Sequence, residues 1–111
     1  MPPRPTPRAL EPVPPERAFY FYTGVGRPLG VVANSLKEFG ALIKSVEVSS
    51  LEFHLDRGDF ERWVMMLGDG GLAKSLGRVR ERRLAGEKLR AELVRVVRVR
   101  IERLRRPPAR R

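Results

Sequence analysis

Basic side chains in the second half of the chain are the residues best suited to bind a ligand. Residues 72–111 carry 15 Lys and Arg against 4 Asp and Glu, whereas residues 1–71 carry 8 basic and 9 acidic side chains. Most of the basic residues are Arg, whose planar guanidinium group donates two parallel hydrogen bonds to a phosphate. The pattern therefore predicts a polyanionic partner, bound with release of counterions. The predicted nucleic-acid-binding residues are Arg78, Arg80, Arg82, Arg83, Lys88, Arg95, Arg98, Arg103, Arg105, Arg106, Arg110 and Arg111.

The absence of aromatic side chains after Trp63 bears on the kind of nucleic acid. Proteins that bind single strands stack bases on aromatic rings, and the basic half of this chain has none. Contact with the backbone of a structured nucleic acid fits the composition better. We expect structured RNA, including ribosomal RNA, in preference to duplex DNA, because no helix-turn-helix or β-ribbon motif is present and Pro/Arg segments suit irregular RNA grooves.

A solvated helix face is the competing interpretation of the same charges. Glu92 lies three residues before Arg95, and Glu102 lies four residues from both Arg98 and Arg106, so ion pairs along one helix are expected. Four acidic side chains cannot neutralise fifteen basic ones, which favours a partner. Two other functions stay open beside RNA binding: a protein–protein adaptor for an acidic protein partner, and a non-specific DNA-binding protein.

His54 is the only histidine, and it lies in sequence among four acidic residues: Glu52, Asp56, Asp59 and Glu61. A metal site or an acid–base pair therefore has to be considered. Helical spacing places Glu52 and Asp56 on faces away from His54, and the chain has no cysteine and no second histidine to complete a transition-metal site. We expect a structural histidine near the end of a helix, no enzymatic activity, no cofactor and no metal.

Two short motifs resemble functional signatures but have simpler explanations. The glycine-rich segment 24–30 lacks the Lys-Ser/Thr ending of a phosphate-binding loop and contains Pro28 where a helix would begin, so we expect a strand turn. Arg57-Gly58-Asp59 spells the adhesion tripeptide, but a helix stop followed by a helix N-cap explains it. Trp63 falls on the apolar face of a helical pattern, and we expect it in the core rather than in a groove for a partner.

The elements that position these residues are predicted to be a short sheet followed by helices. The aromatic run 18–23 and the apolar residues 31–33 predict two strands separated by a glycine-rich turn. Capping boxes are predicted at Ser35 with Glu38 and at Ser49 with Glu52. The predicted helices cover residues 36–43, 50–57, 60–67, 72–83 and 86–106. We therefore predict an α+β, mostly helical fold with short N-terminal strands and four to five helices, the last long and basic.

The two ends of the chain differ in composition from its middle. Seven of the ten prolines fall in residues 1–15, and Pro residues favour extended, polyproline-like backbone. We predict an extended Pro/Arg arm at 1–16, one folded domain at 17–106 and a basic tail at 107–111. No apolar run is long enough to span a membrane, and no signal peptide is apparent, so we expect a cytoplasmic protein. The high Arg and low amide content fits a heat-adapted organism, although a GC-rich genome would give the same Arg bias.

Four segments carry a resemblance to a known family. They are residues 19–22 (FYFY), 35–39 (SLKEF), 50–63 (SLEFHLDRGDFERW) and 67–69 (LGD). Together they resemble a family of small, mainly archaeal domains of unknown function, over residues 18–105. The resemblance implies no activity. The Pro/Arg extension at 1–15 and the cationic C-terminal half depart from the usual pattern of the family, which is consistent with a member recruited to a nucleic-acid partner such as the ribosome.

Overall fold

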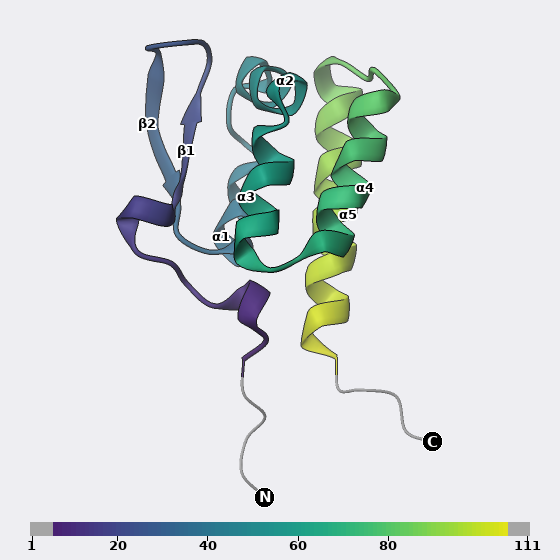
Figure 1. The fold of residues 1–111 in the computed structure, drawn as a ribbon. Helices are drawn as coiled ribbons and strands as arrows, with labels where there is room; N and C mark the ends of the chain where they lie inside the picture. The colour runs from purple at the N-terminus through teal and green to yellow at the C-terminus, as the bar shows by residue number, and fades with distance from the viewer. Residues whose placement is uncertain (1–5, 107–111) are drawn as a thin grey trace, which may run out of the picture.

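The computed structural model describes residues 6–106 as a two-stranded sheet followed by five α-helices (Figure 1). The strands are β1 (Phe19–Tyr22) and β2 (Pro28–Ala33), and the helices are α1 (Leu36–Leu42), α2 (Val48–Arg57), α3 (Asp59–Leu67), α4 (Gly70–Glu81) and α5 (Gly86–Arg105). The predicted α+β, mostly helical fold is confirmed. Within the described chain, no helix is long and apolar enough to cross a membrane.

The antiparallel hairpin of β1 and β2 delivers two aromatic rings to the core. Successive side chains of a strand point to opposite faces, so Phe19 and Phe21 are buried while Tyr20 is exposed. The second strand begins at Pro28, earlier than its predicted start at Val31, because the turn occupies only residues 23–27. The glycine-rich segment therefore forms the strand turn that the sequence predicts, together with the start of β2.

Local residues determine two of the helix ends. Ser35 caps α1 as predicted, because its hydroxyl oxygen accepts the Glu38 N–H at 3.1 Å. Gly58 ends α2 with φ 74°, a left-handed conformation that glycine adopts without steric cost. The same glycine then precedes the first residue of α3. The predicted helix stop at Gly58 is confirmed.

Two predicted N-caps are wrong. The N-cap of α2 is Glu47 rather than Ser49, and Glu52 instead accepts the backbone N–H of Gly86 at 2.8 Å, which links α2 to the start of α5. Asp59 is the first residue of α3 rather than its cap, and its carboxylate is bound by His54 of α2 and by Arg62. In both cases a contact between elements takes the carboxylate that a local cap would have used.

The core lies between the hairpin and the helices. Phe19 forms its centre, with the rings of Phe39, Phe60 and Trp63 at centroid distances of 5.2 to 5.6 Å. The long helix α5 contributes one face, buried at every fourth residue: Leu89, Leu93, Val97 and Ile101. The prediction that Trp63 belongs to the core is confirmed, since only 8% of the residue is exposed.

The described part of the predicted arm packs on the domain. Short 3-10 turns at Arg8–Leu10 and Pro15–Arg17 replace a continuous extended segment, and Ala9 is buried. The first of these turns contacts α1, α3 and α5, and the indole N–H of Trp63 donates to the Arg17 carbonyl at 2.8 Å. Figure 1 shows this segment crossing the end of the domain where α5 also finishes. Residues 1–5 and 107–111 lie outside the described chain.

Candidate nucleic-acid interface

Helices α4 and α5 pack against each other and carry most of the predicted binding residues (Figure 1). Apolar residues of α5 face the core, so its basic residues are left on the outward side. Seven of the predicted residues are exposed and have no ion-pair partner among the described residues; we call them the cationic face. The cationic face consists of Arg78, Arg83, Lys88, Arg98, Arg103, Arg105 and Arg106.

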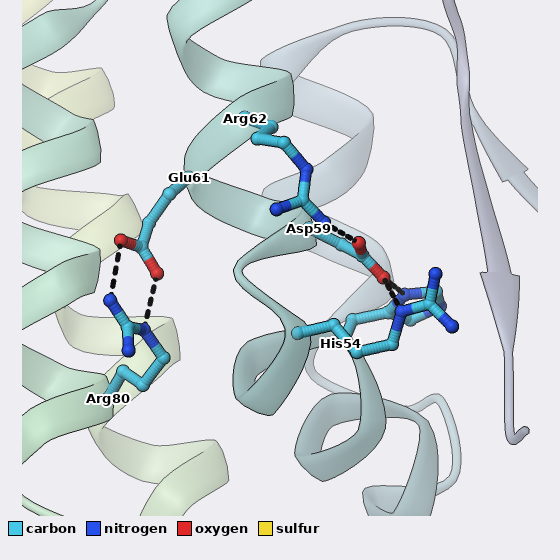
Figure 2. A network of polar contacts seen from close by, with 6 residues as sticks. His54, Asp59, Glu61, Arg62 and Arg80 are labelled. Atoms are coloured by element: carbon cyan, nitrogen blue, oxygen red, sulfur yellow. Dashed lines mark hydrogen bonds and ion pairs between the residues drawn. The ribbon is translucent and has the colours of Figure 1, made fainter.

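Three other predicted residues are engaged in ion pairs. Arg80 pairs with Glu61 of α3 through two hydrogen bonds, of 2.8 and 3.3 Å, which raise the pKa of the Arg80 guanidinium (Figure 2). Arg82 and Arg95 share Glu92, and hydrogen bonding to Arg95 is the largest cause that lowers the pKa of the Glu92 carboxyl. The remaining two predicted residues, Arg110 and Arg111, lie outside the described chain.

The predicted ion pairs along α5 form only in part. Arg95 donates two hydrogen bonds to Glu92, at 2.7 and 3.0 Å, as expected from their spacing. Glu102 has no ion-pair partner among the described residues, although Arg98 and Arg106 lie four residues away on either side. The acidic residues of α4 and α5 therefore leave most of the outward charge unbalanced.

Arg100 is a structural residue that sequence reasoning missed. Its Nε and Nη2 atoms donate to the two carboxylate oxygens of Asp69 at 2.8 and 2.9 Å. The Asp69 side chain is only 1% exposed, and the same carboxylate accepts the Leu72 N–H as the cap of α4. Asp69 before two glycines is a recognisable N-cap pattern, and it explains why α4 begins at Gly70 rather than at the predicted Leu72. Its partner Arg100 is 31 residues away, so no local sequence pattern indicates this ion pair.

A groove of about 320 Å³ runs between α4 and α5 beside this ion pair. Small residues of α4 form one side, and α5 supplies three arginines and two valines on the other. The lining residues are Gly71, Ser75, Arg95, Val96, Val99, Arg100 and Arg103. The groove therefore places basic groups along a hollow that is continuous with the cationic face through Arg103.

His54 lies in the last turn of α2, with both ring nitrogens in hydrogen bonds. Its Nε2 accepts the Tyr22 backbone N–H at 2.8 Å, so this nitrogen carries no proton, and Nδ1–H donates to the Asp59 carboxylate at 2.8 Å (Figure 2). Burial lowers the pKa of the imidazole, although the hydrogen bond to Asp59 opposes the shift. The ring is therefore neutral and joins β1 to the α2–α3 junction.

The Asp59 carboxylate contacts His54 and two arginines next to it in the structure. Burial favours the protonated carboxyl, but hydrogen bonds from His54 and Arg62 outweigh it and lower the Asp59 pKa. Arg57 adds an ion pair at 3.3 Å and also lies over the Phe53 ring, 4.9 Å from its centroid. Both ring nitrogens of His54 are therefore engaged within the domain, and only 4% of the residue is exposed. No group of three His, Cys, Asp or Glu that could hold a metal ion occurs in residues 6–106.

Residues 7–98 match the family DUF5752, which is described as a family of unknown function. The chain belongs to this family. The predicted resemblance is confirmed at this level, although the match already begins at residue 7, so the packed part of the Pro-rich segment belongs to the domain and not to an added extension. No curated protein and no solved structure matches the chain.

In this DUF5752 member, residues 50–63 connect several elements of the domain. His54 and Asp59 join the hairpin to α2 and α3 by hydrogen bonds. Glu61 accepts hydrogen bonds from Arg80 of α4, and the Trp63 indole donates to the Arg17 carbonyl. The matched residues end at Arg98. Three members of the cationic face, Arg103, Arg105 and Arg106, therefore lie beyond the matched range.

Proposed function

We propose that this protein is a non-enzymatic binding protein of the cytoplasm that docks on structured RNA through the cationic face, as a ribosome-associated component. One observation carries the proposal: seven exposed basic side chains on α4, α5 and their link have no acidic partner within the described chain. Unpaired like charges on one surface repel each other, and a polyanion relieves that repulsion.

The dimensions of α5 support contact with several phosphates. From Lys88 to Arg106 the chain rises about 27 Å, at 1.5 Å per residue. All but two members of the cationic face lie along this length. If about five phosphates are neutralised, the logarithm of the binding constant falls with the logarithm of salt concentration with a slope of about −4 to −5.

The experiment is a salt series with a charge-reversed variant and a matched control. We would measure binding of a fluorescent RNA stem-loop by anisotropy for the triple variant Lys88→Glu, Arg98→Glu, Arg105→Glu. The control carries Arg27→Glu, Lys37→Glu and Lys44→Glu, which reverse exposed charges on the hairpin and around α1. Both variants have the same net charge.

We expect the interface variant to bind about 100-fold more weakly and its salt slope to become shallower by about 3, because three phosphate contacts are lost. The control should stay within about threefold of the unaltered protein, since only the long-range field changes. Equal losses in both variants would mean that total charge and not the cationic face drives binding. Equal affinity for duplex DNA and RNA would favour the DNA-binding alternative.

Sedimentation of a cleared lysate tests the ribosome and the adaptor alternative together. Co-migration with a ribosomal subunit that is lost after RNase treatment would support the ribosome proposal. A protein partner that stays bound after nuclease treatment would instead favour an adaptor, for which the same face would bind an acidic protein surface.

A further inference from the structure

We infer that the groove between α4 and α5 binds a single phosphate group. The inference rests on the proposed function for the source of that phosphate, which is either the backbone of the docked RNA or the phosphate of a smaller ligand. The groove differs from the rest of the cationic face because it is hollow and because two of its three arginines are held in a fixed orientation.

The orientation of the Arg100 side chain is fixed by an ion pair on one edge of its guanidinium group. Its Nε and Nη2 atoms are bound to the buried carboxylate of Asp69, which is itself fixed by the Leu72 N–H. A guanidinium group bound along this edge still has N–H groups on Nη1 and Nη2 that point away from the carboxylate. Because 34% of the Arg100 side chain is exposed and it lines the groove, these donors are available to a ligand.

Arg95 repeats the arrangement about one and a half turns earlier on α5. Its Nε and Nη2 atoms are bound to the two oxygens of Glu92, and its side chain is 56% exposed. Two arginines held in this way lose little conformational freedom when they bind an anion. Arg103 has no ion-pair partner among the described residues and supplies a full positive charge at the same groove.

The α4 side of the groove admits a tetrahedral anion. Gly71 has no side chain, and a Cβ atom placed there would lie 3.4 Å from Nη2 of Arg100, so glycine leaves the guanidinium group open to the groove. One turn further along, the Ser75 hydroxyl adds a donor to the lining. Arginine forks and a hydroxyl suit phosphate better than a carboxylate, which has fewer oxygens to accept their hydrogen bonds.

The experiment follows the arginine side chains directly. We would record the Nε–Hε resonances of Arg95 and Arg100 by NMR while adding inorganic phosphate at constant ionic strength, with chloride as the reference. Saturable shifts at both side chains, together with the Gly71 and Ser75 amides, are expected with phosphate alone. Equal shifts with chloride, or no saturation at these groups, would overturn the inference.

Two variants change the groove without removing its internal ion pairs. Arg103→Gln removes the unpaired charge, and Ser75→Asp places an anion inside the groove. Each should weaken phosphate binding about tenfold or more, because Arg103→Gln removes a hydrogen bond from a charged donor and Ser75→Asp adds a carboxylate that repels the phosphate. Arg98→Gln, which alters the net charge by the same amount outside the groove, should leave it unchanged. Equal weakening in all three would show an effect of net charge and contradict a defined site.

The same titration separates this inference from the proposed function. If RNA binds but phosphate gives no saturable shift, the groove assignment is wrong and RNA docking stands. If phosphate saturates the groove but the RNA stem-loop does not bind, the groove assignment stands and the RNA proposal fails. Displacement of phosphate by RNA would identify the RNA backbone as the occupant, whereas simultaneous binding of both would identify a smaller phosphorylated ligand.

Discussion

Replacement of His54 tests the assignment of this residue to the fold rather than to chemistry. In His54→Ala the Tyr22 N–H loses its acceptor, and a buried unsatisfied donor costs about 1–3 kcal/mol. The imidazole also packs at centroid distances of 4.8 to 5.7 Å from Phe19, Phe53 and Phe60, and its removal leaves a cavity worth about 2 kcal/mol. We expect a loss of about 3–5 kcal/mol in the free energy of unfolding.

Two conservative variants divide this loss between the two ring nitrogens. The amide of His54→Gln reaches the position of Nε2 and can accept the Tyr22 N–H, whereas the amide of His54→Asn stands near Nδ1 and can donate only to Asp59. Asp59 keeps Arg57 and Arg62 in either case. His54→Gln should therefore cost about 1–2 kcal/mol and His54→Asn at least about 1 kcal/mol more, because only the second leaves a buried donor unsatisfied.

Urea unfolding followed through fluorescence measures these differences, since Trp63 is the only tryptophan and lies in the core. The pH dependence supplies an independent reading. The lowered pKa of His54 means that the unfolded chain binds a proton more readily, so this stabilisation is complete above pH 6.5 and is lost as pH falls below it. The slope cannot exceed about 1.4 kcal/mol per pH unit and should be absent in His54→Gln. An equal stability of the Asn and Gln variants, with the slope retained in both, would refute the reasoning.

Three further substitutions test single structural assignments, each by urea unfolding. Asp69→Ala should lower the free energy of unfolding by about 3 kcal/mol, because a helix cap and a half-buried ion pair are lost. Adding Arg100→Ala to this variant should cost little more, and additive losses would argue against the pairing. Arg83→Gly should raise the free energy of unfolding by about 1 kcal/mol, because Arg83 has φ 53° in the α4–α5 link, and a decrease would contradict this account. Ser50→Ala should stabilise the protein by about 1 kcal/mol, since its buried hydroxyl has no hydrogen-bond partner among residues 6–106; destabilisation would reveal one.

The sequence predicts those features that depend on neighbouring residues. The cap at Ser35, the stop at Gly58 and the pair of Glu92 with Arg95 each involve residues within one helical turn, and all three form as expected. The alternation of buried and exposed residues in β1 and α5 likewise follows from the period of each element. Local chemistry therefore gives the element order and the core face.

Features that depend on distant partners are not predictable in this way. Glu52 and Asp59 have the residue types and spacing of helix caps, but Gly86 and His54 compete for them from other elements. The same limit applies to the groove, because Asp69 and Arg100 are separated by 31 residues and only the packing of α4 on α5 brings them together. The sequence could identify a basic region, but it could not distinguish its structural arginines from its unpaired ones.

The distinction between paired and unpaired charge leads to a prediction about salt. If the basic residues only solvated and stabilised the domain, their ion pairs would weaken as salt screened them, and the protein would become less stable. The pairs that form in the basic half involve Arg80, Arg82, Arg90, Arg95 and Arg100, whereas the cationic face has no ion-pair partner within the described residues. Repulsion within that face should dominate at low ionic strength.

We therefore expect the free energy of unfolding to rise as KCl increases from 20 to 200 mM, where the screening length falls from more than 20 Å to about 7 Å. The triple variant Lys88→Glu, Arg98→Glu, Arg105→Glu should lose this dependence, and the matched control on the hairpin and around α1 should keep more of it. A fall in stability with salt in the unaltered protein would mean that its charges are balanced in the folded state. The main physical reason for a polyanionic partner would then disappear, because the outward arginines would need no further neutralisation.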